Sequence, residues 1–180
     1  MPHKRVIISL PFSKENEAQW LIPMGETINH PKPEVPLGHP GIDFAWDHTV
    51  PIIAVADGVI KSVKKDSTEG KAVWNIYVAS GDYLTGYTEL ESYNTELYKG
   101  SKVSKGMLIG YPNEANHQIH WEFEYNTPLN FLIEPLCPMT YFDEEARSRI
   151  ESIWENQGDR WPYKDKFPYI CSGDFYGKDA

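Results

Sequence analysis

Two short clusters of this 180-residue chain hold the residue types that bind transition metals. The first, GHPGIDFAWD, contains His39 and Asp43, and the second, NHQIHWEFE, contains His120. Zinc in proteins takes imidazole nitrogens and carboxylate oxygens at about 2 Å, and a catalytic site keeps one position for water. The three residues between His39 and Asp43 can curl so that both side chains meet one ion, with His120 as the third ligand. A His and an Asp at this spacing also occur by chance, so the alternative is a solvated His39 and a core-facing His120.

The composition restricts the class of protein that would carry such a site. A formal net charge of −9 argues against a nucleic-acid partner, because such proteins gather Lys and Arg to replace phosphate counterions. No apolar run approaches the ~20 residues of a membrane span. The first twelve residues contain no signal-peptide pattern. We therefore expect a cytoplasmic protein as the sequence is written, or an extracellular or periplasmic one if a leader has been removed.

The elements that must position these residues are mainly strands. Apolar, β-branched and aromatic runs predict a hairpin over residues 50–63 with its turn at Asp57-Gly58, and a second strand pair over 73–79 and 83–90. Further strands are expected at 107–110 and 119–125. Acidic residues in the first turn and apolar residues at helical spacing predict a helix over 143–155. The fold class is thus mainly β, an antiparallel sheet with a C-terminal helix and an aromatic tail.

Cys137 and Cys171 are the two cysteines, and both lie late in the chain. They lack metal-ligand spacing to each other. Either they form a disulfide that pins the tail to the sheet, or they are two buried free thiols.

Five markers occur in order along more than half of the chain: GHPGIDFAW, VPIIAVADGVI, YTELESY, KGSKVSKGMLIGY and IHWEFEYNTPLNFL. In this ordered set, from residue 37 to 132, the sequence resembles the lysostaphin/LytM-type zinc metalloendopeptidases, which cut peptidoglycan. The resemblance implies a partly barrel-like antiparallel sheet and a zinc ion held by His39, Asp43 and His120. It also implies a peptidoglycan or other peptide substrate. We expect a metallopeptidase-like β domain over residues 1–142, followed by the helix and tail over 143–180.

The sequence departs from that family at both of its usual catalytic histidines. The family has His-x-His on the last strand, where this chain has Gln118 and His120, and side-chain alternation points His117 away from the site. The family also has a Tyr-x-His-Leu stretch, where this chain has Glu89 in Tyr87-Thr88-Glu89-Leu90. Both substitutions affect the same chemical step.

Two hypotheses follow. In the first, the chain is an enzyme, in which zinc lowers the pKa of its water towards ~7, Glu89 takes the proton and Gln118 donates a hydrogen bond to the oxyanion. In the second, the chain is a retired enzyme that holds a cell-wall peptide or glycan, or regulates a partner, with Glu89 as a possible fourth zinc ligand. In either case Trp46, Tyr87, Trp121 and Tyr125 line the groove or pack in the core.

Overall fold

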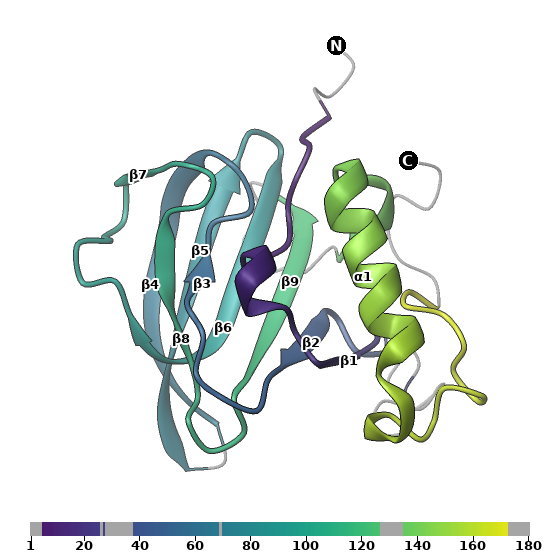
Figure 1. The fold of residues 1–180 in the computed structure, drawn as a ribbon. Helices are drawn as coiled ribbons and strands as arrows, with labels where there is room; N and C mark the ends of the chain where they lie inside the picture. The colour runs from purple at the N-terminus through teal and green to yellow at the C-terminus, as the bar shows by residue number, and fades with distance from the viewer. Residues whose placement is uncertain (1–4, 26, 28–37, 69, 127–134, 173–180) are drawn as a thin grey trace.

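The computed structural model describes residues 5–25, 27, 38–68, 70–126 and 135–172 of the protein. Within these residues the chain forms one antiparallel sheet that is curled but not closed, with one α-helix beside it (Figure 1). The predicted fold class is confirmed. Residues 37, 69 and 127–132 of the family-like stretch lie outside the described residues.

Nine strands make up the described sheet, in the order β1-β2-β9-β6-β5-β4-β7, and β8 pairs with β3 and β6. Their bounds are β1 (Trp20–Ile22), β2 (Ile42–Ala45), β3 (Ile52–Ile53), β4 (Gly58–Thr68), β5 (Lys71–Ser80), β6 (Tyr83–Tyr93), β7 (Lys102–Val103), β8 (Leu108–Pro112) and β9 (Gln118–Tyr125). Short 3-10 helices cover Lys14–Asn16, Pro138–Thr140 and Gly158–Arg160.

The strand pair predicted around Ser80-Gly81-Asp82 is confirmed as the β5–β6 hairpin. Gly81 has a φ of 64° at its turn, a conformation that glycine adopts without a steric cost. Ile76 and Tyr87 of this hairpin are fully buried in the core. Because side chains alternate along a strand, Tyr77 of β5 lies on the opposite face of the sheet from Ile76.

The hairpin predicted at Asp57-Gly58 is wrong. β3 pairs with β8, and β4 pairs with β5 and β7, so the two predicted arms never meet. Asp57-Gly58 instead forms a corner, in which the Asp57 carboxylate accepts the Lys105 N–H at 2.8 Å and the Asp57 carbonyl accepts the Ser80 hydroxyl at 2.7 Å. The long β4–β5 pairing supplies far more hydrogen bonds than a short local hairpin would.

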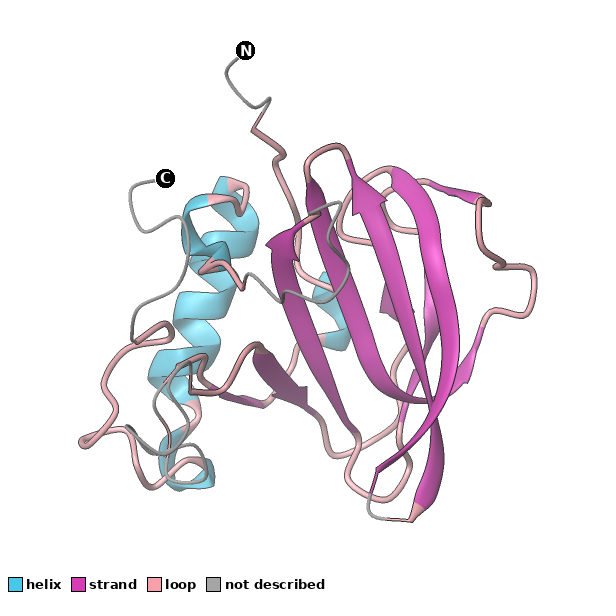
Figure 2. Cartoon of the chain, turned by 180° about the vertical axis from the view of Figure 1, so that it is seen from behind, coloured by secondary structure: helices cyan, strands magenta, loops and turns pink. Residues whose placement is uncertain are grey.

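The predicted helix is confirmed as α1 (Glu144–Asn156). The Asp143 side chain caps it by accepting the Ala146 N–H at 2.8 Å, and Ile150 and Trp154 are among its buried residues. Figures 1 and 2 place α1 at the β1–β2 end of the sheet, away from β4 and β7. None of the helices in the described part of the chain is long and apolar enough to span a membrane.

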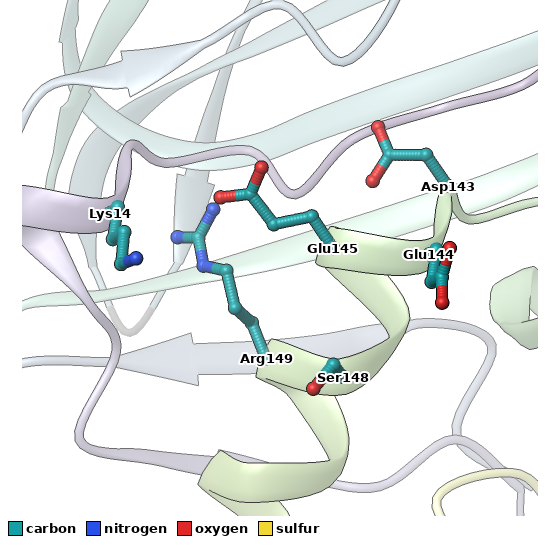
Figure 3. A pocket seen from close by; sticks show the side chains of 6 residues that line it. All are labelled: Lys14, Asp143, Glu144, Glu145, Ser148 and Arg149. Atoms are coloured by element: carbon teal, nitrogen blue, oxygen red, sulfur yellow. The ribbon is translucent and has the colours of Figure 1, made fainter.

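A shallow hollow lies at the first turn of α1, lined by Lys14, Asp143, Glu144, Glu145, Ser148 and Arg149 (Figure 3). Arg149 forms an ion pair with Glu17 at 2.9 Å there and so ties the helix to the N-terminal segment. None of the three predicted metal ligands lines this hollow.

The tail returns to the body of the protein after α1. Cys137 and Cys171 form a disulfide with a Cα–Cα distance of 5.9 Å, so the bridged alternative is confirmed. The Leu21 N–H of β1 donates to Gln157 Oε1 at 2.8 Å just beyond the helix. The expected division of the chain between residues 142 and 143 falls at the start of α1 and stays a prediction.

Candidate metal centre

His39, Asp43 and His120 converge on one point. His39 Nε2 lies 3.0 Å from His120 Nδ1 and 3.2 Å from Asp43 Oδ1, and His120 Nδ1 lies 2.7 Å from Asp43 Oδ1. Of the described residues, these three form the group with metal-ligand types close enough to share an ion. The structure therefore brings together the residues predicted as ligands, and their role as ligands stays a prediction.

The sheet register places two of the three. Asp43 of β2 lies directly opposite His120 of β9 in an antiparallel pair. His39 lies in the chain that leads into β2, and a bend at Pro40-Gly41 brings its ring back over the same strand pair. Gly41 is required for this approach, because a Cβ there would lie 2.4 Å from the Trp121 carbonyl and 3.0 Å from the His120 ring. The motif GHPGID thus folds as the sequence predicted.

The other nitrogen of the His39 ring is also held. His39 Nδ1 lies 2.9 Å from the Pro23 carbonyl, which can only accept, so Nδ1 carries the proton. This leaves the lone pair of Nε2 directed at the cluster. Such an outer partner fixes the tautomer of a ligating histidine.

A carboxylate holds the His120 ring in the same way. His120 Nε2 lies 3.2 Å from Glu122 Oε1, two residues along β9 on the same face. Tyr77 of β5 donates its hydroxyl to Glu122 Oε2 at 3.0 Å. The Thr88 hydroxyl donates to the His120 carbonyl at 2.9 Å and fixes the backbone. With Nε2 facing Glu122, Nδ1 is the nitrogen left for an ion.

Charges inside the cluster are strongly coupled. Burial by itself would raise the pKa of Asp43, but His39 and His120 hold this pKa well below its usual value. Burial opposes a charge on His120, yet Asp43 and Glu122 raise the pKa of His120 to about 10. Because a metal takes an imidazole only in its deprotonated form, zinc and a proton compete for Nδ1.

These residues fit a zinc ion. In a tetrahedron with bonds of about 2.0–2.1 Å, ligand atoms lie about 3.3 Å apart, close to the separations of the three atoms here. Two imidazoles and one carboxylate make a three-ligand set of the kind that catalytic zinc uses. The second nitrogen of each imidazole also faces a hydrogen-bond acceptor, the Pro23 carbonyl for His39 and the Glu122 carboxylate for His120.

Glu89, predicted as a catalytic residue, lies beside the cluster without joining it. Thr88, the residue before it, pairs with His120 across β6 and β9. Glu89 sits at an irregularity of β6 with a φ of 63°, and its N–H donates to Asn75 Oδ1 at 3.1 Å. Its Oε1 accepts the Thr68 hydroxyl at 3.4 Å, at the end of β4. Its catalytic role stays a prediction.

Gln118, the second predicted catalytic residue, begins β9 two residues before His120 and is half-buried. Strand alternation places its side chain on the same face as His120. His117 lies in the turn before β9 with a φ of 48°, and its Nδ1 is 3.4 Å from the Thr49 hydroxyl oxygen. It is not part of the group of three.

The four aromatic residues considered for the groove lie in the core or pack against it. Trp46, Tyr87 and Trp121 are at most 3% exposed and belong to the core. The Tyr87 hydroxyl accepts the Val55 N–H at 2.9 Å inside it. Tyr125 is half-buried and stacks on Tyr83.

A comparison with protein families now identifies the domain. The model of peptidase family M23 matches residues 37–131, just over half of the chain and the part that carries all three clustered residues. The chain belongs to peptidase family M23. The resemblance to lysostaphin-type enzymes, drawn from five sequence markers, is thereby confirmed for this M23 domain.

Solved structures of similar fold agree with this assignment. Csd3 from Helicobacter pylori matches at 18% identity with a TM-score of 0.57, covering 91% of this chain and 44% of that chain. The catalytic domain of the prophage-encoded M23 protein EnpA from Enterococcus faecalis matches at 20% identity with a TM-score of 0.53, covering 74% of this chain and 96% of that one. Lysostaphin, an antimicrobial peptidase from Staphylococcus simulans, matches at 20% identity with a TM-score of 0.53, covering 83% of this chain and 55% of that one.

This chain spans 44% of the length of Csd3. At 18–20% identity, these likenesses show the fold alone. No curated protein matches the chain.

The residues that hold the two ligand rings were not predicted from the sequence. Glu122 could have been found, because it lies two residues after His120 in IHWEFEY and strand alternation puts both on one face. Tyr77 and Pro23 carry no local signal, since their contacts depend on pairings between distant segments.

Proposed function

We propose that this chain is a zinc-dependent endopeptidase domain that hydrolyses a peptide bond, in peptidoglycan by analogy with its family. His39, Asp43 and His120 are the proposed zinc ligands. The observation that carries the proposal is the convergence of three ligand atoms within 3.2 Å of one another. The acceptors Pro23 and Glu122 support it, because they leave the inward nitrogen of each ring available.

Different groups at the site are proposed to carry the separate steps of hydrolysis. Bound zinc supplies a Lewis acid that polarises the substrate carbonyl and lowers the pKa of water towards ~7. Glu89 accepts the proton of the attacking water, which requires its carboxylate to turn from Thr68 towards His120. The side-chain amide of Gln118, for which the described residues show no hydrogen bond, donates to the oxyanion that forms at the carbonyl.

A second candidate is a metal-binding domain that no longer cuts. Both histidines of the family pattern are replaced, and the Glu89 carboxylate accepts a hydrogen bond from Thr68 at the β4 end. Such a domain would keep the ion and hold a cell-wall peptide or glycan, or regulate a partner.

Metal analysis combined with a hydrolysis assay tests the proposal. The purified chain is stripped with a chelator, reloaded with zinc and incubated with peptidoglycan and with short stem and cross-bridge peptides, and new amino groups are identified by mass spectrometry. One zinc per chain and zinc-dependent cleavage are expected. His120→Ala should lose both, whereas His48→Ala, which removes an exposed histidine paired with Asp47, should lose neither.

The outcomes separate the two candidates. A chain that retains no zinc contradicts both. A chain that holds zinc and cuts no substrate, but begins to cut as the double variant Glu89→His/Gln118→His, is a retired M23 domain.

A further inference from the structure

His39 is held by a segment from outside the M23 match. The backbone of His39 pairs with that of Gly25 through two hydrogen bonds. The Gly25 N–H donates to the His39 carbonyl at 2.8 Å, and the His39 N–H donates to the Gly25 carbonyl at 2.6 Å. Its ring donates to the Pro23 carbonyl at 2.9 Å. Residues 23–25 therefore set both the position of this ligand and the direction in which its ring points.

Residues 170–172, called the tail segment below, hold residues 23–25 in turn. The Met24 N–H donates to the Ile170 carbonyl at 2.8 Å, and the Ser172 N–H donates to the Met24 carbonyl at 3.0 Å. The fit is close at Gly25, because a Cβ there would lie 1.5 Å from the Ser172 carbonyl oxygen. Gly25 also has a φ of 99°, which disfavours any other residue.

The tail segment is fixed at its centre. Cys171, its middle residue, is joined by the disulfide to Cys137, 34 positions earlier in the chain. Ile170 is only 7% exposed and packs in the core. A disulfide reduces the number of conformations that the linked segment can adopt when its other contacts open. The bond therefore favours the tail segment in its place beside Met24.

We propose that the tail segment, anchored by the Cys137–Cys171 disulfide, is a positioning element of the metal centre that holds His39 through residues 23–25. The inference rests on the proposed function, since it takes His39 as a ligand. Opening the disulfide loosens the tail segment, then residues 23–25, and then His39, while Asp43 and His120 keep their places in the sheet. Metal affinity falls as a result, and the sheet stays folded.

The test compares the oxidised chain with the double variant Cys137→Ser/Cys171→Ser. Serines replace the reduced cysteines because free thiolates would bind zinc themselves. Zinc affinity is measured by competition with a chromogenic chelator, and cobalt(II) is substituted to record its visible spectrum. We expect roughly a 10-fold loss of affinity, the lower end of what removing an outer partner of a metal ligand costs, and a changed cobalt spectrum.

Hydrogen exchange provides a local measure that general destabilisation would not give. In the double serine variant the amides of Met24, Gly25 and Ser172 should exchange faster, and those of β6 should keep their protection. Leu97→Ala is the matched control. It removes a buried apolar side chain from the loop that connects β6 to β7, and Leu97 takes no part in the hydrogen bonds of the tail segment. It should lower stability without changing zinc affinity.

Two further measurements keep the inference testable if the serine variant does not fold. Gly25→Ala keeps both cysteines but forces the Ser172 carbonyl away, and should also weaken zinc binding. In the unaltered chain, bound zinc should slow reduction of the disulfide by a phosphine, because the coupling between the two sites is reciprocal.

Equal zinc affinity and an equal cobalt spectrum in the oxidised chain and the folded serine variant overturn the inference and leave the proposed function standing. If the serine variant is unfolded, a reduction rate that does not respond to zinc overturns it. Absence of zinc binding in the oxidised chain overturns the inference together with the proposed function.

Discussion

The Tyr77 hydroxyl reaches Glu122 Oε2 at 3.0 Å across Gly86, which lies between them in the sheet. The three residues form one row over β5, β6 and β9. Glu122 in turn faces His120 Nε2, so the row connects a residue two strands away to a proposed zinc ligand. Burial and the Glu122 carboxylate raise the pKa of Tyr77, which keeps its hydroxyl protonated as the donor.

Tyr77→Phe should weaken zinc binding roughly threefold, less than the 10-fold effect of a direct partner because Tyr77 acts through Glu122. The measurement is a chelator competition on the folded variant. Tyr111→Phe removes a hydroxyl from a partly exposed tyrosine on β8 and serves as the control. Equal affinity in both variants would show that Tyr77 does not support the centre.

Gly86→Ala should weaken zinc binding more than Tyr77→Phe does. The added Cβ would lie 2.7 Å from Glu122 Oε2 and 2.9 Å from Tyr77 Cε1. Both atoms belong to side chains that can swing away, so Glu122 loses its hydrogen bonds while the sheet stays paired. We expect a folded protein by circular dichroism with at least a 10-fold lower zinc affinity. Unchanged affinity would mean that the Glu122 carboxylate need not face His120.

Glu89→Gln separates a proton acceptor from a ligand. If Glu89 takes the proton of water, zinc content stays at one per chain and hydrolysis falls by about 10² to 10⁴, the usual contribution of a general base. A ligand would lose zinc affinity instead. Glu91→Gln, an exposed acid two residues further along β6, is the control and should behave like the unaltered chain. No effect on either quantity would favour the metal-binding domain without catalysis.

Glu124→Gln should raise the free energy of unfolding at neutral and alkaline pH, because it removes a carboxylate that is costly to ionise in the folded protein. Burial and the neighbouring Glu122 carboxylate raise the pKa of Glu124 to about 7, although Lys61 opposes the shift. Glu124 also interacts electrostatically with Tyr77. An acid whose pKa is higher in the folded state stabilises below its unfolded pKa of about 4.3 and loses that stability as pH rises through the folded pKa. The stability of the unaltered chain relative to the variant should therefore fall between about pH 4.5 and 7.

Urea denaturation at a series of pH values measures this difference. Allowing for the solvent that still reaches the carboxylate, we expect the variant to be more stable by about 2 kcal/mol at pH 8 and about equal at pH 4.5. A difference that is constant with pH would contradict the raised pKa.

Local signals in the sequence were sufficient for part of the fold. Ser80-Gly81-Asp82 between β-branched and aromatic runs predicted the β5–β6 hairpin, and acidic residues before an apolar helical pattern predicted α1. Asp57-Gly58 gave a wrong hairpin prediction, because the same dipeptide occurs in hairpin turns and in corners. Only the pairing of β4 with β5 decides between the two.

The candidate site also has a part that the sequence predicted and a part that it did not. His39 and Asp43 lie four residues apart, so a local bend brings them together, and His120 followed from the family pattern. The supports of the site come from residues that are distant in sequence, such as Pro23 for His39 and Tyr77 for Glu122. Contacts of this kind depend on strand register and chain return, which a single sequence does not specify locally.

The pairing of Met24 with Cys171 has a consequence for how the protein matures. During translation all three proposed ligands are made well before residues 170–172. A nascent chain can thus display His39, Asp43 and His120 while the segment that steadies His39 is still missing. Metal captured at that stage would be held loosely and exchanged readily, and firm capture would wait until the tail has been synthesised and oxidised. Zinc would then be held firmly only after the disulfide has fixed residues 170–172 beside Met24.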